Sequence, residues 1–251
     1  CALPIWNLGE NYSAPLALAV TEVGNDGSMT CRFECRHRFV PAGIETAPAR
    51  LPTLLSEPSF SVDTAVLDHD IDCLAFAIKE RFHVNIRKDV LAEMGLPAGQ
   101  WLDDFKQALF QKKTPDTPIE IPAAGTSEPK RFALGELTEK LAVITEGQKI
   151  AYITDAAYTD ANISKMANLA ADADHLFIEA AFLEKDRSIA AAKRHLTARQ
   201  AGRIAALAGV KRFTLFHFSP RYSGEYDPFD AEAHWAYEET IRNRTAKRKK
   251  R

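Results

Sequence analysis

The sequence predicts an α+β protein that changes to an α/β layer pattern after Phe132. Two observations support this fold class. The first third of the chain alternates apolar and polar residues with a period of two, which is typical of antiparallel strands. After Phe132, apolar strand-like runs alternate with helix-like segments, which is the order found in layered α/β sheets.

The first third opens with a hairpin signal. The alternating segments PLALAVTEV (15–23) and MTCRFECRHRF (29–39) are separated by GNDG, a turn rich in residues that tolerate positive φ. A proline-rich connection is expected from Pro41 to Pro58. It leads to two further strands, FSVDTAVLDH (60–69) and CLAFAIKE (73–80).

The periodicity weakens between Val84 and Pro122. Only the short amphipathic piece DVLAEMGL (89–96) stands out, and the polar stretch from Gln111 to Pro129 follows it. Long structureless connections inside compact domains are uncommon and usually functional. We therefore expect an extended surface excursion over about residues 81–122, outside the core.

The last third carries the α/β signal. Strands are expected at KIAYITD (149–155), HLFIEAAF (175–182) and RFTLFHFS (212–219), and helices near residues 161–171, 187–193 and 198–208. The third helix is the best marked, because Thr197 and Gln200 have capping-box spacing. Gly209 stands where a glycine that ends the helix is expected.

Composition indicates a soluble protein of the cytoplasm. No apolar run approaches the ~20 residues that a membrane helix needs, and the four cysteines show no disulfide framework. The net charge of −2 does not by itself suggest a nucleic-acid partner. Residues 242–251, however, carry seven Lys/Arg and no acid. This basic tail is either a solvated end or a tether that contacts phosphate groups.

Ionisable residues follow several of the apolar strands. Asp155, Glu179 and His217 come at the ends of the three strands expected in the last third, and His69 follows an earlier strand. In α/β sheets, functional groups collect at the carboxyl ends of strands, where side chains leave a rigid core. His195 is placed differently, just before a helix N-terminus whose dipole disfavours a charged imidazolium.

Each of these residues, taken singly, has an ordinary structural explanation. A histidine at a strand end is more often a hydrogen-bonded structural residue, and an aspartate there is more often a turn former or cap. Taken together, two histidines and one aspartate at strand ends are ligand types that zinc prefers. A carboxylate can also bridge two metal ions.

Several segments of the chain resemble ribonuclease Z, the tRNA 3′-processing endonuclease of the metallo-β-lactamase superfamily. These segments are IWNLGENY, LDHDIDCLAF, KIAYITDAAYTD, ADADHLFIEAAF and RHLTARQAGRIAALAGVKRFTLFHFSPRY. The resemblance covers about residues 5–222, and the run from 194 to 222 is the most specific part. It implies an αββα sandwich that holds two Zn²⁺ ions.

The resemblance also implies roles for individual residues. By position, His69, Asp155 and His217 look like metal ligands, and Asp155 looks like the one that bridges the two ions. His195 looks like the histidine that helps to protonate the leaving oxygen. Glu179 occupies the position of the glutamate that orients this histidine.

Two further positions are carried over as substrate-binding residues. Thr197 belongs with His195 to a His-Ser-Thr motif, in which Leu196 replaces the serine. Arg221 is a possible anchor for a carboxylate or phosphate. The sequence departs from the family again at Ile178, where the family often has histidine.

One defining feature of the superfamily is missing from this chain. The His-x-His-x-Asp-His signature, which supplies most ligands of one zinc, occurs nowhere, and the seven histidines are dispersed. In the family this signature lies upstream of the segment that resembles IWNLGENY, and the chain begins with Cys1 and not with Met. We therefore expect residues 1–241 to be the C-terminal portion of a metallo-β-lactamase-like domain, incomplete at its N-terminal side. Truncation and a naturally short protein both stay open.

The function expected of the intact protein is zinc-dependent removal of 3′ trailers from precursor tRNA, carried out by a homodimer. The excursion at 81–122 falls where the family carries its tRNA-gripping arm, and GLPAGQWL (95–102) weakly resembles part of that arm. One alternative is a hydrolase of the same fold that acts on a small phosphodiester or ester, because one fold serves many substrates. Another is a non-catalytic relic that binds nucleic acid. The chain by itself is expected to be inactive.

Overall fold

The structure, a computed structural model, describes residues 16–48, 51–122, 129–222 and 224–248. Its contacts divide the chain into two compact units, residues 1–52 and residues 53–251. The segment IWNLGENY and the last three residues of the predicted basic tail lie outside the described residues.

The first unit holds a three-stranded antiparallel sheet in the order β1-β2-β3. Its strands are β1 (Ala17–Val23), β2 (Ser28–Glu34) and β3 (Pro41–Ala47). The predicted hairpin is confirmed, since Val23 pairs with Ser28 across the GNDG turn. The prediction that an irregular connection begins at Pro41 is wrong, because β3 pairs with β2. Pro41 opens an outer strand, where its missing N–H is tolerated.

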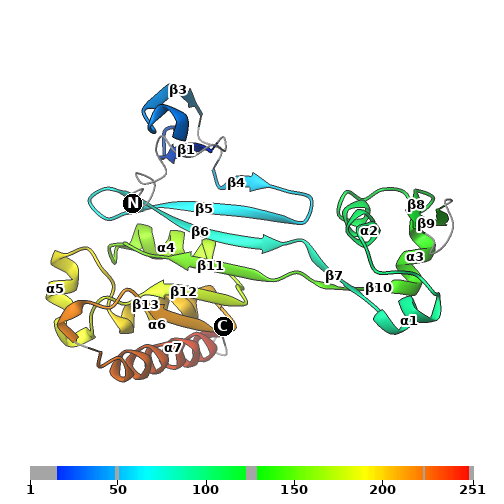
Figure 1. Cartoon of the computed structure of the whole chain (residues 1–251). Helices are drawn as coiled ribbons and strands as arrows, with labels where there is room; N and C mark the ends of the chain where they lie inside the picture. The colour runs from blue at the N-terminus through cyan, green and yellow to red at the C-terminus, as the bar shows by residue number, and fades with distance from the viewer. Residues whose placement is uncertain (1–15, 49–50, 123–128, 223, 249–251) are drawn as a thin grey trace. The chain divides into compact units, whose positions relative to one another are not determined.

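A six-stranded mixed sheet lies at the centre of the second unit, in the order β13-β12-β11-β6-β5-β4 (Figure 1). Its strands are β4 (Thr53–Ser56), β5 (Phe60–Asp68), β6 (Asp72–Glu80), β11 (Lys149–Ile153), β12 (His175–Glu179) and β13 (Phe213–Phe216). The strands β11, β12 and β13 are parallel, and the other neighbours are antiparallel. Five of these strands are predicted from the sequence; β4 lies inside the predicted connection and is not.

Helices cover one face of this sheet. The helical elements are α4 (Asp160–Leu169), η3 (Glu184–Asp186), α5 (Arg187–Ala192), α6 (Ala198–Ala208), η4 (Pro220–Tyr222) and α7 (Asp227–Arg248). Helices α4 and α6 pack on the sheet, and α7 packs on α6 (Figure 1). The strands offer these helices buried residues at alternate positions, such as Ala151, Ile153 and Ile178. The three predicted helices are confirmed, and α6 has its predicted bounds.

The other face of the same strands is apolar but exposed. Ile150 pairs with Ile78 across β11 and β6, and Tyr152 lies two residues further along β11. Each of these three side chains is more than 40% exposed. Strands that are apolar on both faces are typical of sheets covered on both faces. The unit therefore shows one sheet and one helical layer of the αββα arrangement that the resemblance implies.

Residues 82–146 build a second, smaller core. Its elements are β7 (Phe82–Ile86), α1 (Lys88–Glu93), α2 (Trp101–Phe110), β8 (Pro118–Ile121), β9 (Lys130–Ala133), α3 (Leu134–Leu141) and β10 (Ala142–Glu146). Phe105, Ile121 and Leu137 are fully buried in it. The arm-like excursion at 81–122 stays a prediction, but the segment is not a structureless extension, because its helices and strands bury these residues in a cluster separate from the main core.

Helix α7 runs through Arg248, so much of the predicted basic tail continues a helix and is not a frayed end. Two charged residues of α7 lie at the ends of α6 that the helix dipole favours, Glu232 at the start and Arg244 at the end. The Glu232 carboxylate accepts from the N–H of Arg199 at the start of α6, and the Arg244 guanidinium donates to carbonyls near its end. None of the described helices is both long and apolar enough to cross a membrane.

Candidate active site

Three predicted site residues lie at the carboxyl ends of parallel strands. Glu179 is the last residue of β12, His217 directly follows β13, and Asp155 comes two residues after β11. Because β11, β12 and β13 are parallel neighbours, their carboxyl ends meet at one edge of the sheet. The predicted strand-end placement of these three residues is confirmed.

His195 reaches the same edge from the connection between α5 and α6. Its N–H donates to the carbonyl of Ala190 at the end of α5. Helix α6 begins after Thr197, whose hydroxyl accepts from the N–H of Gln200, while the Gln200 side chain accepts from the N–H of Thr197. The predicted capping box is confirmed, and Gly209, with φ of 70°, ends the helix as expected.

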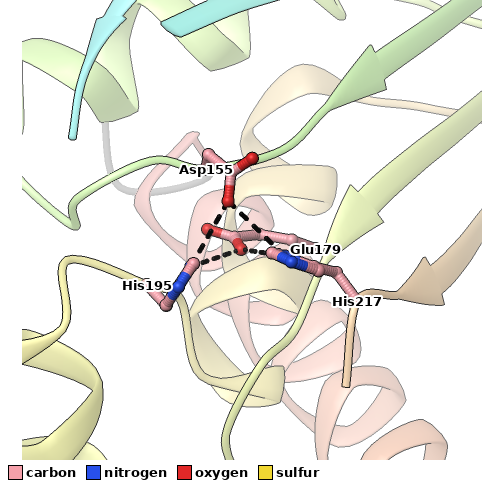
Figure 2. Close-up of side chains that lie close together, drawn as sticks. All are labelled: Asp155, Glu179, His195 and His217. Atoms are coloured by element: carbon pink, nitrogen blue, oxygen red, sulfur yellow. Dashed lines mark hydrogen bonds and ion pairs between the residues drawn. The ribbon is translucent and has the colours of Figure 1, made fainter. Parts of the chain in front are cut away.

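Asp155, Glu179, His195 and His217 form one group, whose candidate ligand atoms all lie within 4.8 Å of one another (Figure 2). Oε2 of Glu179 lies 2.8 Å from Nδ1 of His195 and 3.1 Å from Nδ1 of His217. Oδ1 of Asp155 lies 3.9 Å and 3.7 Å from the same two nitrogens. An ionised carboxylate only accepts, so both Nδ1 atoms donate to Glu179, and in the neutral form of each ring Nε2 keeps its lone pair.

Burial and hydrogen bonding act in opposite directions on the pKa of Glu179. Burial of the whole side chain raises this pKa, but donation from His195, from His217 and from the N–H of Ala156 outweighs burial and holds the pKa below its usual value. The hydrogen bond to Glu179 raises the pKa of His217, partly opposed by burial and aided by the charge of Asp155. At neutral pH, Glu179 is therefore a carboxylate that holds two imidazoles.

Backbone strain is concentrated around this group. Eight non-glycine residues in the described part of the chain have positive φ, and half of these lie in the group or beside it. They are Asp70, Asp155, Arg194 and His217, with φ of 65°, 50°, 60° and 63°. The left-handed conformation costs about 1–2 kcal/mol in a residue other than glycine. Such strain is typical of functional sites, where it is retained because it directs particular side chains.

His69 lies beside the four-residue group and outside it. Its ring centroid is 4.7 Å from that of His195, and its Nδ1 donates to the carbonyl of Arg194 at 2.9 Å. Of the three predicted metal ligands, the structure thus brings Asp155 and His217 into one group and places His69 next to it. The ligand role of His69 stays a prediction.

Thr197 and Arg221, the predicted substrate-binding residues, are engaged within the protein. Thr197 is fully buried and its hydroxyl donates to Glu184 at 2.7 Å. The guanidinium of Arg221 lies 3.3 Å from Asp186, which also accepts from the hydroxyl of Tyr222. In this structure Thr197 caps a helix and Arg221 already has a carboxylate partner. Contact of either residue with a substrate stays a prediction.

The sequence did not reveal the role of Asn162 in α4. This residue is 1% exposed, and its amide accepts from the N–H of Asp68 while donating to the carbonyls of Asp68 and Ala157. It therefore joins the strand end before His69 to the segment after Asp155. An asparagine near the start of an otherwise ordinary helix was the sole signal, and it is equally typical of a solvated helix position.

Arg194 is the second residue that the sequence did not single out. Its guanidinium lies 3.1 Å from Asp68 and 2.5 Å from Asp70. An arginine beside a histidine carries no spacing or periodicity that would mark such a contact. Its partners lie more than a hundred positions away in the sequence, on the β5–β6 turn.

The donor types of the four-residue group fit a metal ion. Two imidazoles and two carboxylates are ligands that zinc accepts, and this is the one such group found in the part of the chain that the structure describes. Cys73 lies in the field of the same carboxylates. Burial raises the pKa of its thiol, and the charges of Asp155 and Glu179 raise it further.

Comparison with known proteins gives the following similarities. Residues 115–218, which include the whole four-residue group, match the family model of the Beta-lactamase superfamily domain. Ribonuclease Z of Deinococcus radiodurans is 30% identical to this chain over 203 residues, which make up 81% of the chain and 57% of that protein. Ribonuclease Z of Thermobifida fusca is 38% identical over 178 residues, or 70% of the chain and 49% of that protein. The chain thus spans about half the length of the curated relatives that it matches.

Solved structures show the same pattern of partial coverage. The metallo-β-lactamase fold protein YhfI from Bacillus subtilis matches 76% of this chain and 49% of its own, with 17% identity and a TM-score of 0.41. Human tRNase Z, short form, matches 68% of this chain and 41% of its own, with 19% identity and a TM-score of 0.38.

Proposed function

We propose that this chain supplies the acid–base residues and part of the metal site of an endoribonuclease. The proposal is supported by its similarity to ribonuclease Z proteins over most of its length and by the match of residues 115–218 to the Beta-lactamase superfamily domain. The proposed substrate is precursor tRNA, from which the 3′ trailer is removed, and the proposed cofactors are two Zn²⁺ ions. The four-residue group at the carboxyl ends of β11, β12 and β13 is the observation that carries this proposal. A homodimer and a cytoplasmic location stay predictions from the resemblance.

Zn²⁺ ions, when bound, supply the Lewis acidity that speeds hydrolysis of a phosphodiester. The side chains of this chain have two tasks. Asp155 and His217, together with His69, hold the ions. Glu179 keeps the Nδ1–H of His195 in place at 2.8 Å, so that Nε2 is the atom of this ring that exchanges protons.

Proton donation by His195 completes the proposed cleavage. Water adds its oxygen to the phosphorus and releases a proton to the solvent, and the bond from phosphorus to the 3′ oxygen breaks. The 3′ oxygen takes a proton from Nε2 of the His195 imidazolium, and the imidazole is then protonated again from the solvent. The negative Glu179 carboxylate stabilises the imidazolium before it gives up the proton. The His195 side chain is 19% exposed, which leaves it accessible to a bound substrate.

One observation favours an alternative, a non-catalytic protein that binds RNA. The described group offers four donors, and two of these, Glu179 and His195, have the acid–base roles in the proposal above. A catalytic zinc usually takes three protein ligands and a water. Two zinc ions therefore need donors beyond those that the described residues bring to the group. A complete gene that encodes His-x-His-x-Asp-His before Cys1 supports the enzyme, and its absence from the complete gene supports the alternative.

The proposed function is tested by assaying the complete gene product on two substrates. These are a labelled precursor tRNA that carries a 3′ trailer and the small diester bis(p-nitrophenyl) phosphate. We expect cleavage at one position of the precursor tRNA, loss of this activity with a chelator, and its return with Zn²⁺. Cleavage of the small diester alone would favour the small-substrate hydrolase. No cleavage of either substrate by metal-loaded protein would overturn the proposal.

The chain of 251 residues gives a second test. We expect it to bind fewer than two equivalents of zinc by elemental analysis and to cleave no precursor tRNA above a metal-only control. Two bound zinc ions with turnover would mean that other residues complete the site. The division of the metal ligands proposed above would then be wrong.

A further inference from the structure

We propose that Arg194 is a positioning residue that fixes the orientation of His69 at the edge of the metal site. The name Arg194 clamp is used for the contacts of Arg194 with Asp68, His69 and Asp70. This inference deepens the proposed function and rests on it, because it is the metal-dependent reaction that gives His69 its role.

The backbone of Arg194 selects one tautomer of His69. Its carbonyl accepts from Nδ1 of His69 at 2.9 Å. A carbonyl cannot donate, so Nδ1 must carry a proton, and in the neutral ring Nε2 then carries the lone pair. Ligating histidines typically make this kind of outer contact through the nitrogen that does not bind the metal.

The side chain of Arg194 fixes the turn on which His69 lies. The guanidinium bridges the two aspartates that flank His69, at 3.1 Å from Asp68 and 2.5 Å from Asp70. The N–H of Asp70 also donates to the Asp68 carboxylate at 3.0 Å, and Asp70 has positive φ. On the other side, the Asn162 amide holds the backbone of Asp68. The turn is thus held from α4 and from the connection before α6.

Stability does not account for an arginine at this position. Its φ of 60° would be unstrained in glycine. Its ion pairs are solvated, because the side chains of Arg194, Asp68 and Asp70 are 38%, 53% and 68% exposed, and exposed pairs contribute little. The strain therefore offsets most of what the pairs contribute. The arginine instead fixes the distance between His69 and His195, which directly follows Arg194 in the chain. The ring centroids of the two histidines lie 4.7 Å apart.

Three variants separate this role from a general structural one. Arg194→Gly removes the guanidinium and relieves the positive φ, while the carbonyl that faces His69 is kept. Arg194→Lys keeps a positive charge and loses the bridge between two carboxylates. Lys112→Gly is the matched control, because Lys112 is also an exposed cation with positive φ (54°), and it lies between α2 and β8, in the second core.

The first measurement needs no metal. Nitrogen-15 NMR of the histidine rings in the metal-free chain reports which ring nitrogen of His69 carries the proton. We expect the Nδ1–H form in the unmodified chain and in Lys112→Gly. In Arg194→Gly we expect a shift toward the Nε2–H form, because without the guanidinium contacts to Asp68 and Asp70 the turn no longer holds the His69 ring against the retained carbonyl. Thermal unfolding is recorded in parallel. We expect both glycine variants to unfold at or above the temperature of the unmodified chain.

The second measurement is zinc affinity, determined by competition with a chromophoric chelator. Loss of an outer partner of a ligating histidine typically weakens metal binding by ~10–100-fold, and we expect this loss in Arg194→Gly, a smaller one in Arg194→Lys and none in Lys112→Gly. In the complete gene product, kcat for precursor tRNA should fall in the same order, with KM little changed.

An unchanged His69 tautomer in Arg194→Gly would overturn the inference, as would zinc affinity equal to that of Lys112→Gly. A large drop in unfolding temperature without a tautomer change would show that Arg194 is merely structural. If the unmodified chain shows the Nδ1–H form and loses it in Arg194→Gly, but the metal-loaded complete gene product cleaves neither precursor tRNA nor the small diester, the clamp stands and the proposed function fails.

Discussion

The parallel strands β11, β12 and β13 have different charged groups at their amino and carboxyl ends, and these groups differ in burial. At their amino ends, the carboxylate of Asp174 accepts from the N–H of Lys149 at 2.7 Å and from Nζ of Lys211 at 2.6 Å. The Lys211 side chain is 71% exposed, so this pair is solvated. At their carboxyl ends, Glu179 is fully buried between the imidazoles of His195 and His217.

Removal of a charged partner therefore has different energetic consequences at the two ends of these strands. A solvated pair contributes little, because water replaces either partner when it is removed. In the buried group, each partner of Glu179 is itself a candidate ligand or acid–base residue, and removal of one leaves the others without compensation. The charged pair at the amino ends contributes only to stability. The carboxyl ends instead retain a buried charge and strained backbone, which is expected of a functional site.

Replacement of His195 by alanine is expected to have the largest effect. A proton donor acts on the reaction and not on metal retention, so turnover of precursor tRNA by the complete gene product should fall by ~10²–10⁴-fold. Zinc content should stay the same. Single-turnover cleavage and elemental analysis measure the two quantities. The matched control is His175→Ala at the amino end of β12, which should leave both unchanged; loss of zinc along with activity would instead make His195 a ligand.

The replacement Asp155→Asn is expected to weaken zinc binding by more than the ~10–100-fold that loss of an outer partner costs. The amide has lost the charge that a carboxylate brings to a cation. Chelator competition on the chain of 251 residues measures the effect. Asp174→Asn makes the same chemical change at the amino ends and should leave zinc affinity unaltered. Equal effects of the two variants would remove the distinction between the two ends.

The carboxyl-end residues could be predicted because their signals are local. An apolar run that stops at an ionisable residue locates Asp155, Glu179 and His217, and capping-box spacing locates the start of α6 after His195. The hydrogen bond between Glu179 and His217 could not be predicted. It depends on the register in which Glu179 of β12 pairs with Phe216 of β13, and parallel register is set by tertiary packing.

The second core escaped prediction for a related reason. Phe105 and Leu137 are buried in one cluster but lie on two separate helices, α2 and α3, and the contact between them depends on tertiary packing. The polar stretch from Gln111 to Pro129 between these helices favoured the prediction of a surface excursion. Strand β3 was missed because Pro41 and Gly43 are typical of connections. The burial partners in the second core are distant in sequence, and local patterns carry no information about them. The partner of β3 is the neighbouring strand β2, so here the residue types and not the distance hid the pairing.

The replacement Glu179→Gln is expected to destabilise the metal-free chain by about 1–3 kcal/mol, because buried donors lose an ionised acceptor. The pKa of Glu179 is held below its usual 4.5, so its contribution is present above that pH and is lost as the pH falls through the lowered pKa. The pKa of His217 is raised above its usual 6.5, so its contribution is present below 6.5 and is lost as the pH rises. The destabilisation should therefore be largest between these two values.

Urea unfolding of the unmodified chain and of Glu179→Gln at a series of pH values measures this difference. The expected profile has a maximum and declines on both sides. A difference in the free energy of unfolding that does not vary with pH would show that Glu179 acts by packing alone. That result would remove the electrostatic part of the contrast between the two strand ends.

The smallest effect is expected for Asp174→Asn, whose cost in the free energy of unfolding should be about 0.2–1 kcal/mol at neutral pH. The hydrogen bond to Lys211, followed by that to the Lys149 N–H, holds the pKa of Asp174 below its usual 3.8. Its contribution is therefore present above 3.8 and is lost as the pH falls through the lowered pKa. Asparagine can still accept from the Lys149 N–H, so what is lost is the attraction to Lys211, which salt screens. Urea unfolding should thus show a smaller difference in the free energy of unfolding between Asp174→Asn and the unmodified chain in 1 M NaCl than in dilute buffer. A difference that is large, or that does not change with salt, would mean that the amino ends are as specialised as the carboxyl ends.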